Sequence, residues 1–167
     1  MAIFVSGRGS NLQALLDQEG CNIRLVCSHG LPTAADLKSK RNFIPLLKSK
    51  KINFSEWQLH LQARQISQIF LLGFMRLVPA DFIKSWSNQI LNLHPSLLPL
   101  FPGLSAIERS FHEREKMGVT VHRVIPQMDA GGSVLQSKVF EAAQAPSDFK
   151  MASLIMTFRE HFLVRKA

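Results

Sequence analysis

An amide and an imidazole stand two residues apart at the end of a short apolar run in the middle of the chain. Residues 90–94 read ILNLH, so Asn92 and His94 alternate with apolar neighbours. In an extended strand, residues i and i+2 project from the same face, which would bring the two side chains together. An asparagine amide can donate to an oxygen that becomes negative, and a histidine can take or give a proton near neutral pH.

The same pair also fits a second interpretation, in which His94 is a buried histidine that bonds to backbone at a strand end and has no chemical role. Three prolines follow it, at positions 95, 99 and 102. Proline lacks an N–H and fixes its own φ, so the strand cannot continue and a rigid, turning loop follows. The carboxyl end of a strand is where an open α/β sheet places its ligands, which favours the catalytic interpretation without deciding it.

A third candidate is Asp129, the acid in a tight loop that reads PQMDAGG over residues 126–132. A carboxylate beside an imidazole raises its basicity and fixes its tautomer. The sequence has no Gly-x-Ser-x-Gly motif and no histidine-paired cysteine pattern that would mark a covalent nucleophile. Asn92, His94 and Asp129 therefore indicate direct transfer of an acyl group between two bound substrates, although sequence alone does not establish that Asp129 reaches His94.

A glycine-rich turn, SGRGSN at residues 6–11, follows the first apolar run of the chain, AIFV at residues 2–5. A helix is expected to begin near Ser10 or Asn11, with either residue as its N-cap. A strand, a glycine turn and a helix N-terminus together form a geometry that cradles phosphate. The turn lacks the lysine of a Walker loop and the third glycine of the dinucleotide fingerprint, so a plain connecting turn is the alternative.

Strands and helices alternate along the chain, as expected for one α/β domain over residues 1–167 with a mainly parallel sheet. The apolar runs predict strands at residues 2–5, 23–27, 66–72, 90–94, 120–124 and 133–140, with a brief strand at 43–46. The strand at 133–140 is expected to be antiparallel. Helices are predicted from residue 10 or 11, at 33–41, 55–65, 80–86 and 105–116, and from 148 onward, with caps at Thr33, Ser55, Ser105 and Ser147.

The composition is that of a globular domain, with 46% hydrophobic and 19% charged residues. No apolar run is long enough to span a membrane, and no basic region precedes the short apolar run at the N-terminus, so we expect neither a membrane span nor a secretory signal. Two cysteines make no disulfide framework, so we expect a cytoplasmic location. The net charge of +8 favours anionic partners. The basic run at residues 38–51 is interpreted as a solvated face, so nucleic acid is not the expected partner. His29, His60 and His112 are expected at the surface and His122 and His161 in structural roles, with no metal site.

Six blocks carry a resemblance to a known family. They read SGRGSNLQ (6–13), LGFMR (72–76), NLHPSLLPLFPGL (92–104), GVTVH (118–122), MDAGG with VLQ (128–136) and REH (159–161). In this order they resemble the phosphoribosylglycinamide formyltransferase family, folate-dependent enzymes of purine biosynthesis. The resemblance implies a Rossmann-like open sheet with helices on both faces. It also implies transfer of a formyl group from 10-formyltetrahydrofolate to the amine of glycinamide ribonucleotide, by a monomer or homodimer.

The resemblance also assigns roles to residues. Gly9, Ser10 and Asn11 would hold the ribonucleotide phosphate, and Glu160 would contact the ribose. Asn92 and protonated His94 would stabilise the tetrahedral oxyanion, while Asp129 supports His94 and helps relay a proton to the leaving folate nitrogen. The folate would lie against an apolar segment made of Phe74, Met75, Arg76, Leu77 and Val78, although plain core packing is the alternative for Phe74 and Met75.

The chain departs from the family pattern at several positions. An arginine usual near Ser55 is missing, Leu72 replaces an alanine, Gly132 a proline, and Ser105 begins a continuation that usually contains histidine.

Other functions remain open at this stage. They are a formyltetrahydrofolate hydrolase, a domain like methionyl-tRNA formyltransferase, and a degenerate member that binds ligands without turnover. The intact catalytic candidates argue against the last, and the SGRGSN and FPGL blocks argue against the tRNA enzyme.

Overall fold

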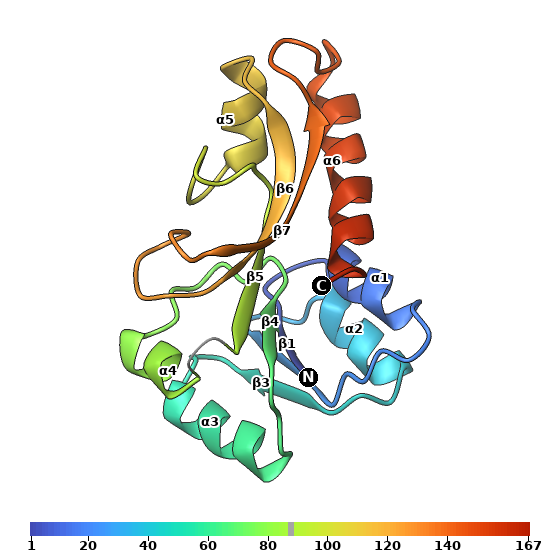
Figure 1. Cartoon of the computed structure of the whole chain (residues 1–167). Coiled ribbons are helices and arrows are strands. Elements are labelled where there is room, and N and C mark those ends of the chain that lie inside the picture. Colours follow the sequence, from blue (N-terminus) through green and yellow to red (C-terminus); the bar gives the residue numbers. More distant parts are fainter. Residues whose placement is uncertain (87–88) are drawn as a thin grey trace. The chain divides into compact units, whose positions relative to one another are not determined.

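The computed structural model describes residues 1–86 and 89–167, which divide into two compact units, residues 1–92 and 93–167 (Figure 1). Each unit is described by itself, and the single domain expected over residues 1–167 stays a prediction. In the described ranges, no helix is both long and apolar enough to cross a membrane.

The first unit is built on parallel strands in the order β3-β2-β1-β4-β5. Their bounds are β1 Ala2–Phe4, β2 Leu25–His29, β3 Leu46–Ser49, β4 Ile69–Leu71 and β5 Ile90–His94. On β1, Ile3 pairs with Val26 on one side and Phe70 on the other, and the strand is fully buried. A parallel strand covered on both faces needs apolar residues throughout, which explains the continuous run AIF.

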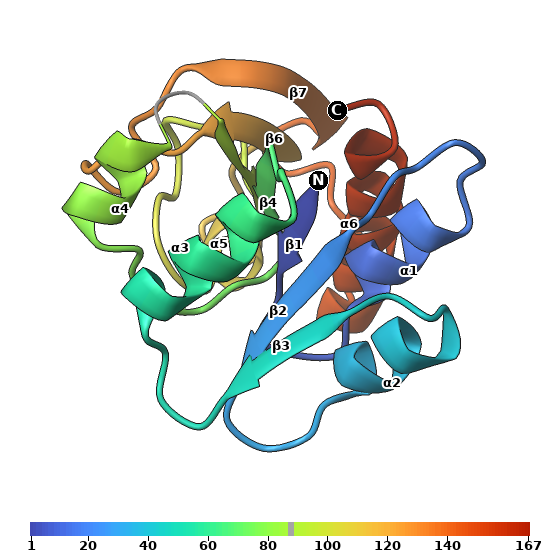
Figure 2. The same ribbon diagram turned by 90° about the horizontal axis from the view of Figure 1, so that it is seen from below.

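Helices cover both faces of this sheet (Figure 2). Helices α1 Ser10–Leu16 and α2 Ala34–Arg41 lie on one face, and α3 Phe54–Ala63 and α4 Ala80–Ser85 on the other. Aromatic rings fill the second interface: Phe4 meets Trp57 edge to face with ring centroids 4.9 Å apart, and Trp57 is fully buried. The predicted α/β class with a mainly parallel sheet is therefore confirmed.

The second unit begins with the end of β5 and contains α5 Ala106–His112, β6 Met117–Arg123, β7 Ser133–Phe140 and α6 Phe149–Val164. Strands β6 and β7 are antiparallel, with Val121 opposite Leu135, which confirms the predicted direction of β7. Helix α6 packs on both strands and buries Ala152 and Met156 completely. Strand β6 is buried over six of its seven residues, so it can hold the loops at its ends in fixed positions.

Several predicted helix caps are wrong. Helix α1 is capped by Gly9 in the left-handed conformation, and α3 by Asn53, whose side chain accepts from two backbone N–H groups. Helix α6 is capped by Asp148 rather than Ser147. Ser105 does occupy the N-cap position of α5, as predicted, but its side chain makes no cap bond. Several residues able to cap stand close together at these positions, so composition alone does not choose among them. The cap at Thr33 is confirmed as a full capping box.

Some element bounds also differ from the predictions. Strand β2 begins at residue 25 rather than 23, β4 covers only 69–71, and α5 ends at 112 rather than 116. The brief strand expected at 43–46 begins instead at Leu46. Phe43 has a positive φ of 55°, which is not a strand conformation, and its side chain is 95% exposed.

A buried ion pair joins α2 to the sheet. Asp36 is 4% exposed and accepts from the Ser28 hydroxyl on β2 at 2.6 Å and from the Thr33 N–H at 2.9 Å. Its charge partner is Lys48 on β3. Burial raises the pKa of Asp36, but hydrogen bonds from Lys48, Ser28 and Thr33 outweigh it and leave the pKa below its usual value. Lys48 is therefore part of this pair rather than of a solvated basic face.

Removing the lysine should destabilise the first unit. Lys48→Met leaves a buried carboxylate without its cation, and we expect the free energy of unfolding to fall by about 3 kcal/mol. Lys50→Met is the matched control, because Lys50 is exposed, and should change stability by less than about 0.5 kcal/mol. Urea unfolding of both variants measures this. Equal stabilities would show that the pair does not hold α2 to the sheet.

Candidate active site

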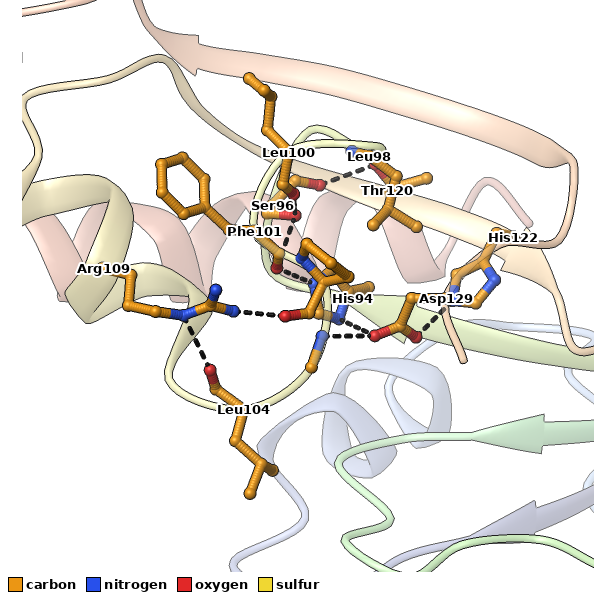
Figure 3. Close-up of polar contacts among 12 residues, drawn as sticks. His94, Ser96, Leu98, Leu100, Phe101, Leu104, Arg109, Thr120, His122 and Asp129 are labelled. Atoms are coloured by element: carbon orange, nitrogen blue, oxygen red, sulfur yellow. Dashed lines mark hydrogen bonds and ion pairs between the residues drawn. The ribbon is translucent and has the colours of Figure 1, made fainter. Parts of the chain in front are cut away.

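His94 occupies the last position of β5, as predicted, and its side chain is buried. The loop that follows is held by β6 and β7. The Thr120 hydroxyl donates to the Ser96 carbonyl at 2.7 Å and accepts from the Leu98 N–H at 3.1 Å, and Gln136 donates to the Leu98 carbonyl at 2.7 Å. The proline-rich loop is thus fixed by polar contacts as well as by proline geometry (Figure 3).

Asp129 lies between two histidines in this unit (Figure 3). Its Oδ2 is 3.6 Å from His94 Nδ1, and its Oδ1 is 3.3 Å from His122 Nε2. The Gly103 N–H donates to Oδ2 at 2.7 Å. The sequence-based hypothesis that Asp129 lies beside His94 therefore agrees with the geometry, although 3.6 Å is longer than a direct hydrogen bond.

These contacts keep the carboxylate ionised. The hydrogen bond with His122 is the largest influence and lowers the pKa of Asp129, whereas burial raises it. The Gly103 N–H and the charge of His94 lower it further, and the pKa falls to about 2. Asp129 is therefore a carboxylate at any pH at which a histidine titrates.

The tautomer of His94 follows from its second contact. Its Nε2 lies 2.8 Å from the Phe101 carbonyl, which can only accept, so Nε2 carries a hydrogen. The nitrogen that gains or loses a proton is then Nδ1, which faces Asp129. Burial is the largest influence and lowers the pKa of His94, while the Phe101 carbonyl and Asp129 raise it and partly offset burial.

The contact of His122 with Asp129 is one that sequence reasoning missed. We expected a structural role for His122, which stays a prediction; its ring is buried, with Nδ1 2.9 Å from the Arg123 carbonyl and Nε2 toward Asp129. The sequence did contain a signal, because His122 stands near the end of a strand, as His94 does. It also shares a strand face with Thr120, which braces the loop after His94.

The other predicted site residues are placed as follows. Asn92 lies half-buried on β5, with one residue between it and His94. Gly9, Ser10 and Asn11 form the turn into α1, where Gly9 has a φ of 66°. A Cβ on Gly9 would come within 2.8 Å of the Ala35 Cβ on α2, so the turn needs glycine here.

The apolar segment at residues 74–78 belongs to the first unit, with the turn at residues 9–11. Phe74 is half-buried against aromatic rings, whereas Met75 and Leu77 are 71% and 76% exposed. Glu160 is half-buried on α6 in the second unit. Substrate roles for these residues stay predictions. Over residues 1–86 and 89–167, no three His, Cys, Asp or Glu side chains are grouped so that they could hold a metal ion.

Comparison with known proteins places this fold and site in a family. The family model described as formyl transferase matches residues 1–145. The chain belongs to this family. It is 32% identical over 154 residues to phosphoribosylglycinamide formyltransferase of Haemophilus influenzae, covering 83% of this chain and 72% of that protein. It is 36% identical over 152 residues to the human trifunctional purine biosynthetic protein adenosine-3, of which it spans only 15%.

A solved structure supports the same fold for this formyl transferase family member. The crystal structure of phosphoribosylglycinamide formyltransferase from Anaplasma phagocytophilum superposes with a TM-score of 0.90 at 29% identity. The match covers 99% of this chain and 82% of that one. The resemblance inferred from the sequence blocks, and the Rossmann-like fold that it implied, are therefore confirmed.

The loop that carries Asp129 offers a sharp test. A Cβ on Gly131 would lie 1.6 Å from the Arg123 carbonyl oxygen, whereas a Cβ on Gly132 meets nothing within 4 Å. Gly131→Ala should therefore displace the loop and lower the free energy of unfolding by at least about 2 kcal/mol. Gly132→Ala should behave like the wild type. Thermal unfolding compares the two, and equal stabilities would contradict the described loop conformation.

The charge of Asp129 predicts the direction in which the pKa of His94 moves when that charge is removed. Because the carboxylate raises the pKa of His94, Asp129→Asn should move the His94 titration to still lower pH. The imidazole Cε1–H resonance of His94, followed by NMR from pH 8 to pH 4, reports this value. A titration that is unchanged, or that moves upward, would show that the carboxylate does not act on His94.

Proposed function

We propose that this chain transfers a formyl group from 10-formyltetrahydrofolate to the primary amine of glycinamide ribonucleotide, a step of de novo purine biosynthesis. Membership of the formyl transferase family supports the reaction class, and relatives named phosphoribosylglycinamide formyltransferase support the acceptor. The observation that carries the proposal is the buried pair formed by His94 at the end of β5 and Asp129 in the loop between β6 and β7. A net charge of +8 suits two anionic substrates.

In this proposal, His94 and Asn92 supply hydrogen-bond donors to the oxygen that becomes negative as the amine adds to the formyl carbon. The Nε2–H of His94 is bonded to the Phe101 carbonyl, so substrate binding must exchange that acceptor for the formyl oxygen. Such contacts commonly form only in the complex with substrate. The new bond joins the amine nitrogen to the formyl carbon, and the bond that breaks joins this carbon to the folate nitrogen.

Asp129 governs the proton balance of the step. The amine loses one proton and the leaving folate nitrogen gains one, so a group in the site must hold a proton in between. Asp129 remains ionised at neutral pH and faces Nδ1 of His94, so it favours a proton at that nitrogen. His122 supports the carboxylate from its other oxygen. This arrangement suits acid–base support of direct transfer.

The binding segments complete the proposal. Gly9, Ser10 and Asn11 take the ribonucleotide phosphate, because a glycine turn before a helix presents free backbone N–H groups to an anion. Glu160 contacts the ribose hydroxyls. The exposed side chains of Met75 and Leu77 offer the folate an apolar surface.

One assay separates transfer from hydrolysis. The protein is incubated with 10-formyltetrahydrofolate, with and without glycinamide ribonucleotide, and folate release is followed. We expect release only when the ribonucleotide is present. Equal release without it would indicate a formyltetrahydrofolate hydrolase, and no release in either mixture would indicate a member that binds without turnover.

Substitution of the central pair should slow transfer. His94→Ala and Asp129→Asn each remove a partner in acid–base work, and we expect kcat to fall at least ~100-fold. His112→Ala and Asp17→Asn remove an exposed histidine and an exposed aspartate, and serve as controls with near-normal rates. Near-normal rates in the His94 and Asp129 variants would refute the mechanism.

The phosphate assignment has its own test. Ser10→Asp places a negative charge against the expected phosphate, so the KM for the ribonucleotide should rise at least ~10-fold while the KM for the folate changes little. Steady-state kinetics with each substrate varied in turn measures both constants. An unchanged ribonucleotide KM would remove the turn at residues 9–11 from the site.

A further inference from the structure

The hydroxyl of Ser6 joins the carboxyl ends of three neighbouring strands in the first unit. Ser6 follows β1 and begins the glycine turn, His29 ends β2, and Met75 lies in the segment after β4. The Met75 N–H donates to Ser6 Oγ at 2.8 Å, and Ser6 Oγ lies 3.0 Å from His29 Nε2. Ser6 and Met75 are 69 positions apart along the chain.

The chemistry of a hydroxyl explains why His29 belongs to this arrangement. A serine hydroxyl has one hydrogen to donate and lone pairs that accept. Because Ser6 Oγ accepts from the Met75 N–H, its own hydrogen is free to be donated to Nε2 of neutral His29. Burial is the largest influence on the pKa of His29 and lowers it, and the charges of Arg76 and Lys48 lower it further, which favours the neutral ring. His29 then orients the lone pairs of Ser6 toward Met75.

The segment is anchored a second time through a side chain. The ring centroid of Phe74 lies 5.4 Å from that of Phe4 and 6.1 Å from that of Trp57. The His29 ring meets Phe74 edge to face, with the two centroids 5.8 Å apart. His29 therefore touches both anchors, the aromatic ring and the hydroxyl. With Phe74 turned inward and the backbone of Met75 held, the side chains of Met75 and Leu77 are directed to solvent.

We infer that Ser6 and His29 are positioning residues that hold the segment at residues 74–78 in the conformation that receives the folate. The inference rests on the proposed function for the identity of the ligand, while the hydrogen-bonded link itself can be tested in the free protein.

The first experiment tests the Ser6–Met75 hydrogen bond in the absence of substrate. Amide hydrogen exchange of Met75, measured by NMR, should be roughly fivefold faster in Ser6→Ala, because one hydrogen bond of ordinary strength is lost. Ser6→Thr keeps the hydroxyl and should restore slow exchange. Ser49→Ala is the matched control, since its hydroxyl accepts from Trp57 Nε1 at 3.2 Å at the end of the adjacent strand β3, and Met75 exchange should not change.

The second experiment reads the consequence for binding. Calorimetric titration with tetrahydrofolate should give a Kd about fivefold higher in Ser6→Ala, while the Kd for the ribonucleotide changes less than twofold. In turnover, the KM for the formyl donor should rise while kcat at saturation is kept. His29→Leu should reproduce the effect of Ser6→Ala, whereas His29→Gln retains an acceptor for the hydroxyl and should rescue it.

The outcomes separate this inference from the proposed function. Unchanged Met75 exchange in Ser6→Ala overturns the link. Faster exchange with unchanged tetrahydrofolate binding overturns the positioning role alone. A wild-type protein that binds no tetrahydrofolate overturns the proposed function and the folate part of this inference, while the exchange result still tests the Ser6–Met75 bond. Equal binding by His29→Leu and His29→Gln would remove His29 from the role.

Discussion

The arrangement of the second unit depends on a buried carboxylate. The side chain of Asp129 is only 10% exposed and is ionised, and a charge in such surroundings is costly unless donors surround it. Three groups lie against it: the Gly103 N–H, which donates to Oδ2, and the rings of His122 and His94. Each belongs to a different segment, so the segments must converge for the charge to be tolerated.

Much of the local geometry follows from that convergence. Asp129 itself has a φ of 52°, a conformation that aspartate tolerates better than most residues. Gly131 lies so close to the Arg123 carbonyl that no side chain fits. The loop after β5 is braced by Thr120 and Gln136 from the neighbouring hairpin, which keeps Gly103 in place to donate. The hairpin β6–β7 thus supplies both a histidine and the brace, and gives the site its rigidity.

In the first unit, polar contacts fix the connecting segments at the ends of a buried sheet. Its parallel strands are short and buried, and their carboxyl ends carry the turn at residues 6–11 and the apolar segment at 74–78. Ends of parallel strands lie along one edge, so small polar groups there can bond across strands. Ser6 does so to Met75, and Asp36 on α2 bonds to Ser28 on β2 and Lys48 on β3. The two clusters share one principle: a short-range polar bond fixes a segment that packing alone would leave loose.

The sequence by itself determined those features that depend on neighbours along the chain. Alternation placed β5, prolines ended it at His94, the Thr33 box capped α2, and the blocks of motif residues identified the family. It failed where several local choices were equivalent, as with the caps of α1, α3 and α6. Residues 43–46 read as a strand, yet Phe43 adopts a left-handed conformation that apolar composition does not reveal.

Only the tertiary structure decided which distant groups meet. Residues 94, 103, 122 and 129 come from four segments, and no periodicity in the sequence encodes their distances. The role of His122 and the tautomer of His94 therefore appear only when the Arg123 and Phe101 carbonyls are in view. The same holds for Ser6 and Met75. The physical reason is that a hydrogen bond depends on separations of a fraction of an ångström, whereas sequence patterns specify only which face a side chain takes.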